Sequence, residues 1–163
     1  MGLPRRLTVH KTKAANSLLE WHRAKNPLTV SLNFIIISLA RMLPSLALKR
    51  ALLRTTGMKV GKNVSIGLAA MFDIFFPELI VLEENCMLGY NCTILAHEFL
   101  REEYRTGPVV IGKNSLLGAN TTVLAGVSIG AGATISACSL VNKDVPAGAF
   151  VGGVPAKELR REK

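Results

Sequence analysis

The sequence predicts an all-β fold, a parallel β-helix built from six-residue repeats, with an α-helical arm before it and a short tail after it. Two observations lead to this prediction. Branched aliphatic residues recur at every sixth position over most of the chain, and Gly, Asn or Asp stand between them. With 163 residues, 49% of them hydrophobic, the chain is long enough for one domain with a substantial core.

The repeat is clearest from Ile111 onward, where the chain divides into six-residue units without a gap. The first position of each unit is aliphatic, and the fifth position is small or aliphatic. The same frame recurs in two earlier segments, 60–71 and 82–99. After residue 110 the first positions are Ile111, Leu117, Val123, Ile129, Ile135 and Val141, and the fifth positions are Ser115, Thr121, Val127, Ala133, Ser139 and Val145.

A period of six indicates strands and not a helix. In an α-helix a step of six residues turns the side chain by about 240°, so such a stripe would face no single side. In a strand, every even step returns to the same face. Each unit also contains turn-forming residues, as in "GKN", "GAN" and "NKD", which predict a corner after each short strand. We therefore expect three units to close one triangular coil, with coils stacked about 4.8 Å apart and the aliphatic residues inside.

The arm before the repeats is basic and apolar. Residues 1–59 contain eleven Lys or Arg and one acidic residue, Glu20, whereas the remainder contains nine basic and ten acidic residues. The apolar residues of the arm have helical spacing, with a break expected at Pro44 and an end at Gly57. The longest mostly apolar run, 28–40, has thirteen residues, fewer than the roughly 20 that a membrane-spanning helix needs.

Two interpretations of the arm remain open. Its helices cap the first coil of the β-helix, or they form a basic amphipathic surface that lies on an anionic membrane. We favour the cap, because an uncovered coil exposes unpaired strand edges. Weak peripheral membrane contact would be an addition to it. Nucleic acid is not an expected partner, because the basic residues alternate with bulky aliphatic residues and offer no stacking platform.

The cysteines indicate a reducing compartment. There are three, an odd number, and we see no cleavable signal peptide, so we expect free thiols and a cytoplasmic location, at most peripheral to the inner face of the membrane. Cys86 and Cys92 occupy fifth positions of the repeat, where we expect small buried corner residues. Cys138 occupies a fourth position, where we expect exposure.

The residues "IGKNSLLGANTTVLAGVSIGAGATI" and "VNKDVPAGAFVGGVPAKELR", with a histidine before an interrupting loop, resemble the hexapeptide-repeat acyltransferases, in particular the maltose and galactoside O-acetyltransferase branch. The resemblance covers about residues 57–160. It implies a left-handed β-helix, a homotrimer, and acetyl-CoA as co-substrate in a groove between neighbouring prisms. We divide the chain into a helical arm (1–56), a β-helix domain (57–155) with a loop at 99–109, and a C-terminal tail (156–163).

His97 is the candidate catalytic residue. It stands at the fourth position of the unit 94–99, so we expect its side chain to face outward and not into the core. A metal site is not expected, because the only other histidines, His10 and His22, both lie in the arm. The resemblance implies that His97 is the general base, which takes the proton of an acceptor hydroxyl as its oxygen attacks the thioester carbonyl.

The resemblance also implies the positions that contact CoA. Short side chains at Ala119 and Ala137 would let the pantetheine lie against backbone amides, with Asn142 and Lys143 on the same edge. Lys157 and Arg160 would pair with the nucleotide phosphates. The sequence departs from the branch in two places: Ser136 and Cys138 replace the usual glycines beside Ala137, and Leu116 stands where a tryptophan is often found.

The acceptor side is less similar to the branch. Its members carry an Asn one coil before the histidine, and we place Ala69 at that position. The stretch "LAAMFDIFF" is apolar apart from Asp73, so we expect Asp73 to contact the acceptor. Tyr104, in the segment that interrupts the repeat after His97, is a second candidate. The alternative is that "MFDIFF" packs at the subunit interface, where aromatic residues are favoured.

Two classes of function remain. The favoured one is an acetyl-CoA-dependent O-acetyltransferase that acts on a hydroxyl of a saccharide or cell-envelope precursor. The alternative is a catalytically silent β-helical trimer that serves as a binding or structural module. His97, Lys143 and Lys157 together favour the enzyme.

Overall fold

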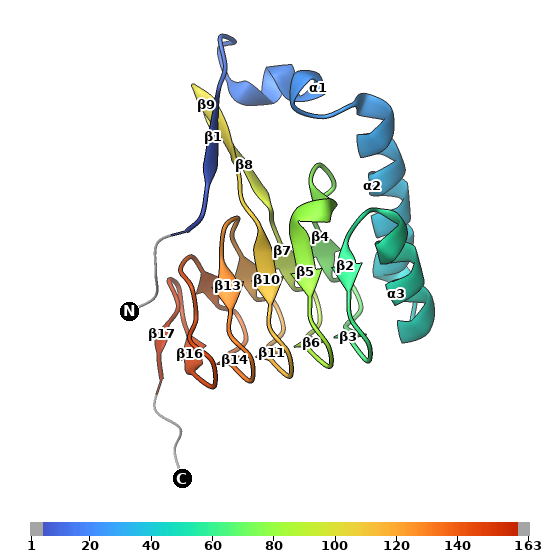
Figure 1. Ribbon diagram of the computed structural model, residues 1–163, viewed down its shortest axis with the longest axis vertical. Helices are drawn as coiled ribbons and strands as arrows, with labels where there is room; N and C mark the ends of the chain where they lie inside the picture. Colours follow the sequence, from blue (N-terminus) through green and yellow to red (C-terminus); the bar gives the residue numbers. More distant parts are fainter. Residues whose placement is uncertain (1–4, 160–163) are drawn as a thin grey trace.

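The computed structural model describes residues 5–159 and shows a three-sided prism of short parallel strands with helices at one end (Figure 1). The chain passes through three sheets in turn, which makes a left-handed β-helix. The first sheet contains β2 (Lys59–Val60), β5 (Ile80–Leu82), β10 (Val109–Ile111) and β13 (Ser128–Ile129). The second contains β3 (Ser65–Ile66), β6 (Met87–Leu88), β11 (Leu116–Leu117), β14 (Thr134–Ile135), β16 (Phe150–Gly152) and the antiparallel β17 (Lys157–Glu158). The third contains β4 (Met71–Phe72), β7 (Thr93–Ile94), β12 (Thr122–Val123) and β15 (Leu140–Val141).

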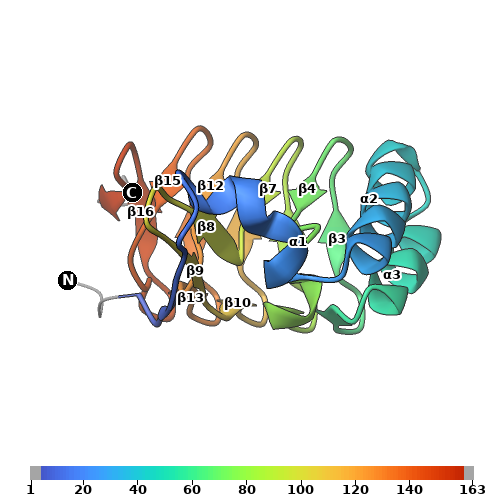
Figure 2. The same ribbon diagram turned by 90° about the horizontal axis from the view of Figure 1, so that it is seen from above.

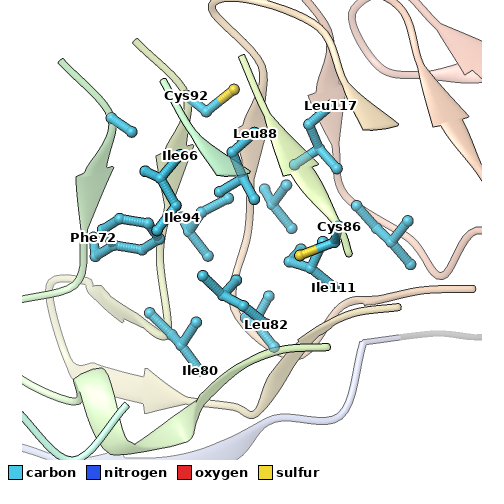
Figure 3. Packing of buried hydrophobic residues seen from close by; sticks show 14 of the residues in the cluster. Ile66, Phe72, Ile80, Leu82, Cys86, Leu88, Cys92, Ile94, Ile111 and Leu117 are labelled. Atoms are coloured by element: carbon cyan, nitrogen blue, oxygen red, sulfur yellow. The ribbon is translucent and has the colours of Figure 1, made fainter. Parts of the chain in front are cut away.

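The interior of the prism is filled by the residues that the repeat predicts (Figure 3). Every first-position residue from Ile111 to Val141 is buried, and Cys86 and Cys92 are buried at fifth positions, so both predictions are confirmed. The exposure predicted for Cys138 is confirmed as well. Asparagines form several corners, because Asn tolerates the left-handed backbone conformation that they need. Such corners occur at Asn63, Asn85, Asn91, Asn114 and Asn120, with φ between 54° and 58°.

Two helices cover the end of the prism at the first coil, α2 (Pro27–Met42) and α3 (Leu46–Thr55) (Figure 2). Their limits follow from local sequence. The side chain of Asn26 caps α2, Pro44 lies in the linker, and the side chain of Ser45 caps α3. Gly57, with φ 91°, ends the segment. The expected break and end are therefore confirmed.

The cations of these helices bind main-chain carbonyls of the first coil. In this prism the N–H groups of one coil donate to the carbonyls of the next, as Gly61 N–H does to Leu82, so the first coil has carbonyls with no strand partner. The fully buried Lys49 donates to the carbonyls of Ile66 and Gly67, at 3.0 and 2.8 Å. The guanidinium groups of Arg41, Arg50 and Arg54 donate to the carbonyls of Ala69, Val64 and Val60, respectively. Much of the positive charge of the arm is thus held at this end of the prism.

The segment that interrupts the repeat is a β-hairpin and not an irregular loop. β8 (His97–Phe99) and β9 (Glu103–Thr106) pair in antiparallel register and project from the prism. β1 (Thr8–Lys11) pairs with the other side of β9, so the arm contributes a strand as well as helices. Between β1 and α2 lie η1 (Ser17–Glu20) and α1 (Trp21–Ala24), and η2 (Pro77–Leu79) precedes β5. No helix within residues 5–159 is long and apolar enough to span a bilayer.

Candidate active site

Asp73 and His97 form a hydrogen-bonded pair where the third sheet ends. Asp73 follows β4 and His97 begins β8, and the parallel pairing of β4 with β7 brings the two residues together. Nδ1 of His97 lies 2.5 Å from Oδ2 of Asp73. The Asp73 carboxylate has no exposed surface, whereas 14% of the His97 side chain is exposed. Only the histidine can therefore meet a substrate.

The carboxylate of Asp73 is held by main-chain donors as well as by the histidine. Its Oδ1 accepts the N–H groups of Phe75 and Phe76, both at 2.9 Å, and its Oδ2 accepts the N–H of Ala96 at 2.7 Å. Burial alone raises the pKa of Asp73. The hydrogen bond and charge of His97 and the main-chain donors outweigh that effect, so the pKa lies below its usual value.

This arrangement fixes the tautomer of His97. An ionised carboxylate has no proton to donate, so the imidazole donates its Nδ1–H to Asp73. In the neutral ring the lone pair is then on Nε2, the nitrogen that Asp73 does not bind. The pair thus has the arrangement of a general base with an orienting carboxylate.

Aromatic rings surround the histidine. The ring centroids of Phe75 and Phe99 both lie 4.8 Å from that of His97, and the centroid of Phe76 lies 5.9 Å away. Phe75 and Phe76 come from the loop after β4, and Phe99 comes from β8 of the hairpin. The imidazole of His97 therefore lies in an apolar setting in which few groups compete for its hydrogen bonds.

Phe75, Phe76 and Phe99 form an aromatic wall around His97, and the arm and the hairpin extend it. The Tyr104 ring lies 5.7 Å from that of Phe99 and stacks on the His10 ring at 4.4 Å. On the other side, the Trp21 ring meets Phe75 edge-on at 5.9 Å. The sequence prediction included Tyr104 but missed the rings from the arm. No local signal identifies His10 or Trp21, because His10 reaches the site through the pairing of β1 with β9 and Trp21 through α1, which follows β1.

Two sequence assignments on the acceptor side are not supported by this geometry. Asp73 is too enclosed for the predicted contact with an acceptor, because His97 and three main-chain N–H groups occupy its oxygens. Ala69 lies at the corner that precedes β4, so the strand separates it from Asp73 and His97. Its carbonyl accepts a hydrogen bond from Arg41 of the cap.

Glu98, next to His97 in sequence, has a separate environment. Successive residues of a strand point to opposite faces, so Glu98 is directed away from the face that carries His97 and Phe99. Its carboxylate forms an ion pair with Arg5 of the arm. Among residues 5–159 there is no group of three or more His, Cys, Asp or Glu side chains that could hold a metal ion.

The residues that the resemblance assigns to CoA fall into two groups. Ala119 and Ala137 lie on adjacent coils, and the N–H of Cys138 donates to the carbonyl of Ala119 at 2.8 Å. Asn142, Lys143 and Lys157 line a cavity of about 330 Å³ at the last coil. Arg160 lies outside the described residues.

The third sheet separates Ala119 and Ala137 from Asn142 and Lys143, whereas Lys157 lies on β17 of the second sheet. Ala137 precedes β15 and Asn142 follows it, so the prediction that they share one edge is wrong. His97 follows β7 of the same sheet, which places Asn142 and Lys143 on the histidine's edge of the prism.

A left-handed β-helix of six-residue repeats with a carboxylate-bound histidine at one corner is typical of a hexapeptide-repeat transferase. Two family models match the chain: "Bacterial transferase hexapeptide (six repeats)" over residues 108–143, and "Hexapeptide repeat of succinyl-transferase" over residues 79–94. A Bacillus subtilis (strain 168) protein named "Putative acetyltransferase YvoF" is 51% identical over 149 residues, which are 91% of this chain and 87% of that protein. "Putative acetyltransferase SAR0816" of Staphylococcus aureus (strain MRSA252) is 42% identical over 155 residues, with 87% and 96% covered. The chain belongs to the hexapeptide-repeat acetyltransferase family.

Solved structures share the fold. A maltose O-acetyltransferase from Clostridium difficile 630 superposes with a TM-score of 0.62 at 20% identity, covering 85% of this chain and 90% of the other. A galactoside acetyltransferase in complex with coenzyme A gives a TM-score of 0.62 at 23% identity, covering 82% and 80%. At these identities the likeness establishes the architecture and leaves the acceptor open.

Proposed function

We propose that the protein transfers an acetyl group from acetyl-CoA to a hydroxyl group of a saccharide or cell-envelope precursor, with His97 as the general base. The observation that carries this proposal is the Asp73–His97 pair, which leaves Nε2 of a partly exposed imidazole available as an acceptor. The coenzyme A and acetyl-CoA complexes of two structural neighbours support the choice of co-substrate.

The chemical step is an acyl transfer. Nε2 of His97 takes the proton of the acceptor hydroxyl as the hydroxyl oxygen attacks the thioester carbonyl, and the carbon–sulfur bond of the resulting tetrahedral species then breaks. The imidazolium returns its proton to the departing thiolate, so the products are the acetyl ester and CoA. Asp73 keeps the ring oriented and stabilises the imidazolium that forms during the step. A general base of this kind contributes about 10²- to 10⁴-fold to the rate.

The aromatic wall defines the acceptor side. Rings of Phe75, Phe99 and Tyr104 offer flat apolar faces beside the base, and the C–H faces of a sugar ring can lie against such surfaces while its hydroxyls point to Nε2. We therefore propose Tyr104 as an acceptor contact. Asp73 is reassigned from acceptor contact to the orientation of His97.

Acetyl-CoA would bind between subunits of a homotrimer. One prism presents Ala119 and Ala137 at one edge of its third sheet and His97 at the other. A groove between two prisms can combine the first edge of one subunit with the second edge of its neighbour. Lys143 and Lys157, both exposed, would then meet the phosphates. The assembly should sediment at about 53 kDa, three times the 17.6 kDa of the chain.

The test compares two histidines of the same aromatic wall. His97→Ala should abolish acetyl transfer, measured as thiol release in a screen of hydroxyl acceptors, with CoA binding by calorimetry unchanged. His10→Ala is the matched control, because His10 stacks on Tyr104 but binds no carboxylate, and it should keep activity within several-fold of the wild type. Turnover by His97→Ala near the wild-type rate would exclude the mechanism.

A further inference from the structure

The outer face of α2 is an uncovered apolar stripe. Leu28, Leu32, Ile35, Leu39 and Met42 follow one another at intervals of four and three residues, and each is between 53% and 76% exposed. The residues that α2 buries against the first coil, among them Val30, Ile37 and Ala40, lie on the opposite side of the helix. Among the described residues, ten of the eighteen exposed large apolar side chains fall between positions 18 and 48.

The charge around this stripe is mainly positive. Residues 21–72, which form α1, α2, α3 and the first coil, contain eight Lys or Arg and no Asp or Glu. Two of these cations, Arg23 and Lys25, form ion pairs with Glu20 and Glu78 outside this range. The cap uses four of these cations to bind main-chain carbonyls, which are neutral acceptors and leave the positive charge uncompensated. Lys59 and Lys62 add exposed positive charge beside the cap. Such an end of the molecule attracts an anionic surface.

We propose that this end of the protein docks on an anionic lipid bilayer, with the stripe of α2 lying flat in the interface. A helix of 16 residues is about 24 Å long, and its stripe runs along that whole length, so it suits insertion parallel to the membrane plane. The alternative partner of the stripe is α2 of a second copy of the protein. The exposed residues that flank the stripe, Thr29 and Ser31, are small hydroxyls and not the charged pairs that usually specify a helix partner.

The proposed trimer would strengthen the contact with the bilayer, and only this strengthening depends on the trimer. Figures 1 and 2 place α2 at the end of the prism, so its outer face points away from the coils. Three prisms side by side would present three such faces at the same end of the assembly. A flat bilayer can meet all three at once, which multiplies the affinity of a single stripe.

Co-sedimentation of the full-length protein with vesicles tests the proposal without any acceptor or CoA, so its failure is distinct from a failure of the proposed activity. Vesicles that mix phosphatidylcholine and phosphatidylglycerol in equal amounts should bind the protein, and binding should weaken as added salt shortens the Debye length from about 10 Å to about 3 Å. Vesicles of phosphatidylcholine alone should bind it less.

The variant Leu32→Gln/Leu39→Gln should lower the vesicle partition coefficient by about tenfold or more, because two exposed leucines no longer enter the interface. Thr29→Gln is the matched control, since it adds a glutamine to the exposed flank of the same helix, and it should bind like the wild type. Both variants should keep the wild-type melting temperature. Absence of vesicle binding by the wild type, or equal binding by the double variant, would overturn the proposal. A larger assembly that the double variant splits, without vesicle binding, would assign the stripe to a second copy.

Discussion

Asp73→Asn should slow catalysis by orders of magnitude while the fold survives. In the wild type the carboxylate accepts the Nδ1–H of His97 and leaves the Nε2 lone pair free. The asparagine places an NH₂ group where Oδ2 was, so it donates to Nδ1 and moves the ring proton to Nε2. A histidine in that tautomer cannot take the proton of a hydroxyl.

The magnitude follows from the loss of the base. We expect kcat to fall by about 10²- to 10⁴-fold, which corresponds to about 2.7–5.5 kcal/mol in the barrier. The KM for acetyl-CoA should not change, because Asp73 has no exposed surface to touch a substrate. Stability should fall as well, by about 2–4 kcal/mol, because the hydrogen bonds from Ala96 and His97 lose a charged acceptor.

Glu98→Gln is the matched control, since it changes a carboxylate to an amide at the next position but on the opposite face of β8. Its kcat should stay within about threefold of the wild type, because the half-buried ion pair of Glu98 with Arg5 does not touch His97. Steady-state kinetics should be measured at a temperature at which circular dichroism shows both variants folded. Nitrogen NMR of His97 gives a readout that does not depend on activity, with the proton on Nδ1 in the wild type and on Nε2 in Asp73→Asn. A folded Asp73→Asn enzyme with kcat within threefold of the wild type would refute the orienting role.

Three further predictions concern stability and reactivity. Lys49→Met should lower the free energy of unfolding by about 2–4 kcal/mol, because two carbonyls of the first coil lose their donor. Lys59→Met, at an exposed position, should change the free energy of unfolding by less than about 0.5 kcal/mol. If chemical denaturation gave equal losses for Lys49→Met and Lys59→Met, the role of Lys49 in the cap would be contradicted. Burial raises the pKa of the Cys86 thiol to about 12, whereas Cys138 is exposed. A maleimide at about pH 8 should therefore label Cys138 and spare Cys86 until the protein unfolds, as peptide mass spectrometry would show. Equal labelling of the two cysteines would contradict the burial of Cys86. Because the pKa of Asp73 is lowered in the folded protein, the stabilising effect of its carboxylate is complete above about pH 4 and is lost as the pH falls through the folded pKa. The difference in melting temperature between the wild type and Asp73→Asn should therefore shrink below about pH 4. A difference that stays constant with pH would contradict the lowered pKa.

The interior of the prism could be predicted because every unit of the repeat meets the same environment. Ile111, Leu117 and Val123 occupy equivalent places in three different sheets, so one frame assigns them all. The same frame detected where the coil is interrupted after His97. It could not show what the interruption becomes, because the hairpin is stabilised by β1, and the pairing of Thr8 with Thr106 joins residues almost a hundred positions apart.

The candidate site likewise contains one residue that the repeat could identify and one whose role only the structure shows. Position four of a unit faces outward, and this local rule identified His97 as a side chain directed away from the core. The role of Asp73 depends on stacking, because the coil must advance by one turn before the carboxylate meets the imidazole. Composition marked Asp73 as the polar residue of an apolar stretch, but only the parallel pairing of β4 with β7 shows that its partner is His97 and not an acceptor.

The two interpretations of the arm concern opposite faces of one helix. On α2, Val30 and Ile37 contact the prism while Leu32 and Leu39 are exposed, and both sets recur at helical spacing. Periodicity alone therefore could not assign either set to the cap. Because the faces are separate, the two properties should vary independently. Lys49→Met should weaken the cap and lower vesicle binding by no more than the loss of its one positive charge, whereas Leu32→Gln/Leu39→Gln should weaken vesicle binding but leave the unfolding free energy near that of the wild type. A double variant that lost stability in step with vesicle binding would mean that the stripe is packed against the protein itself.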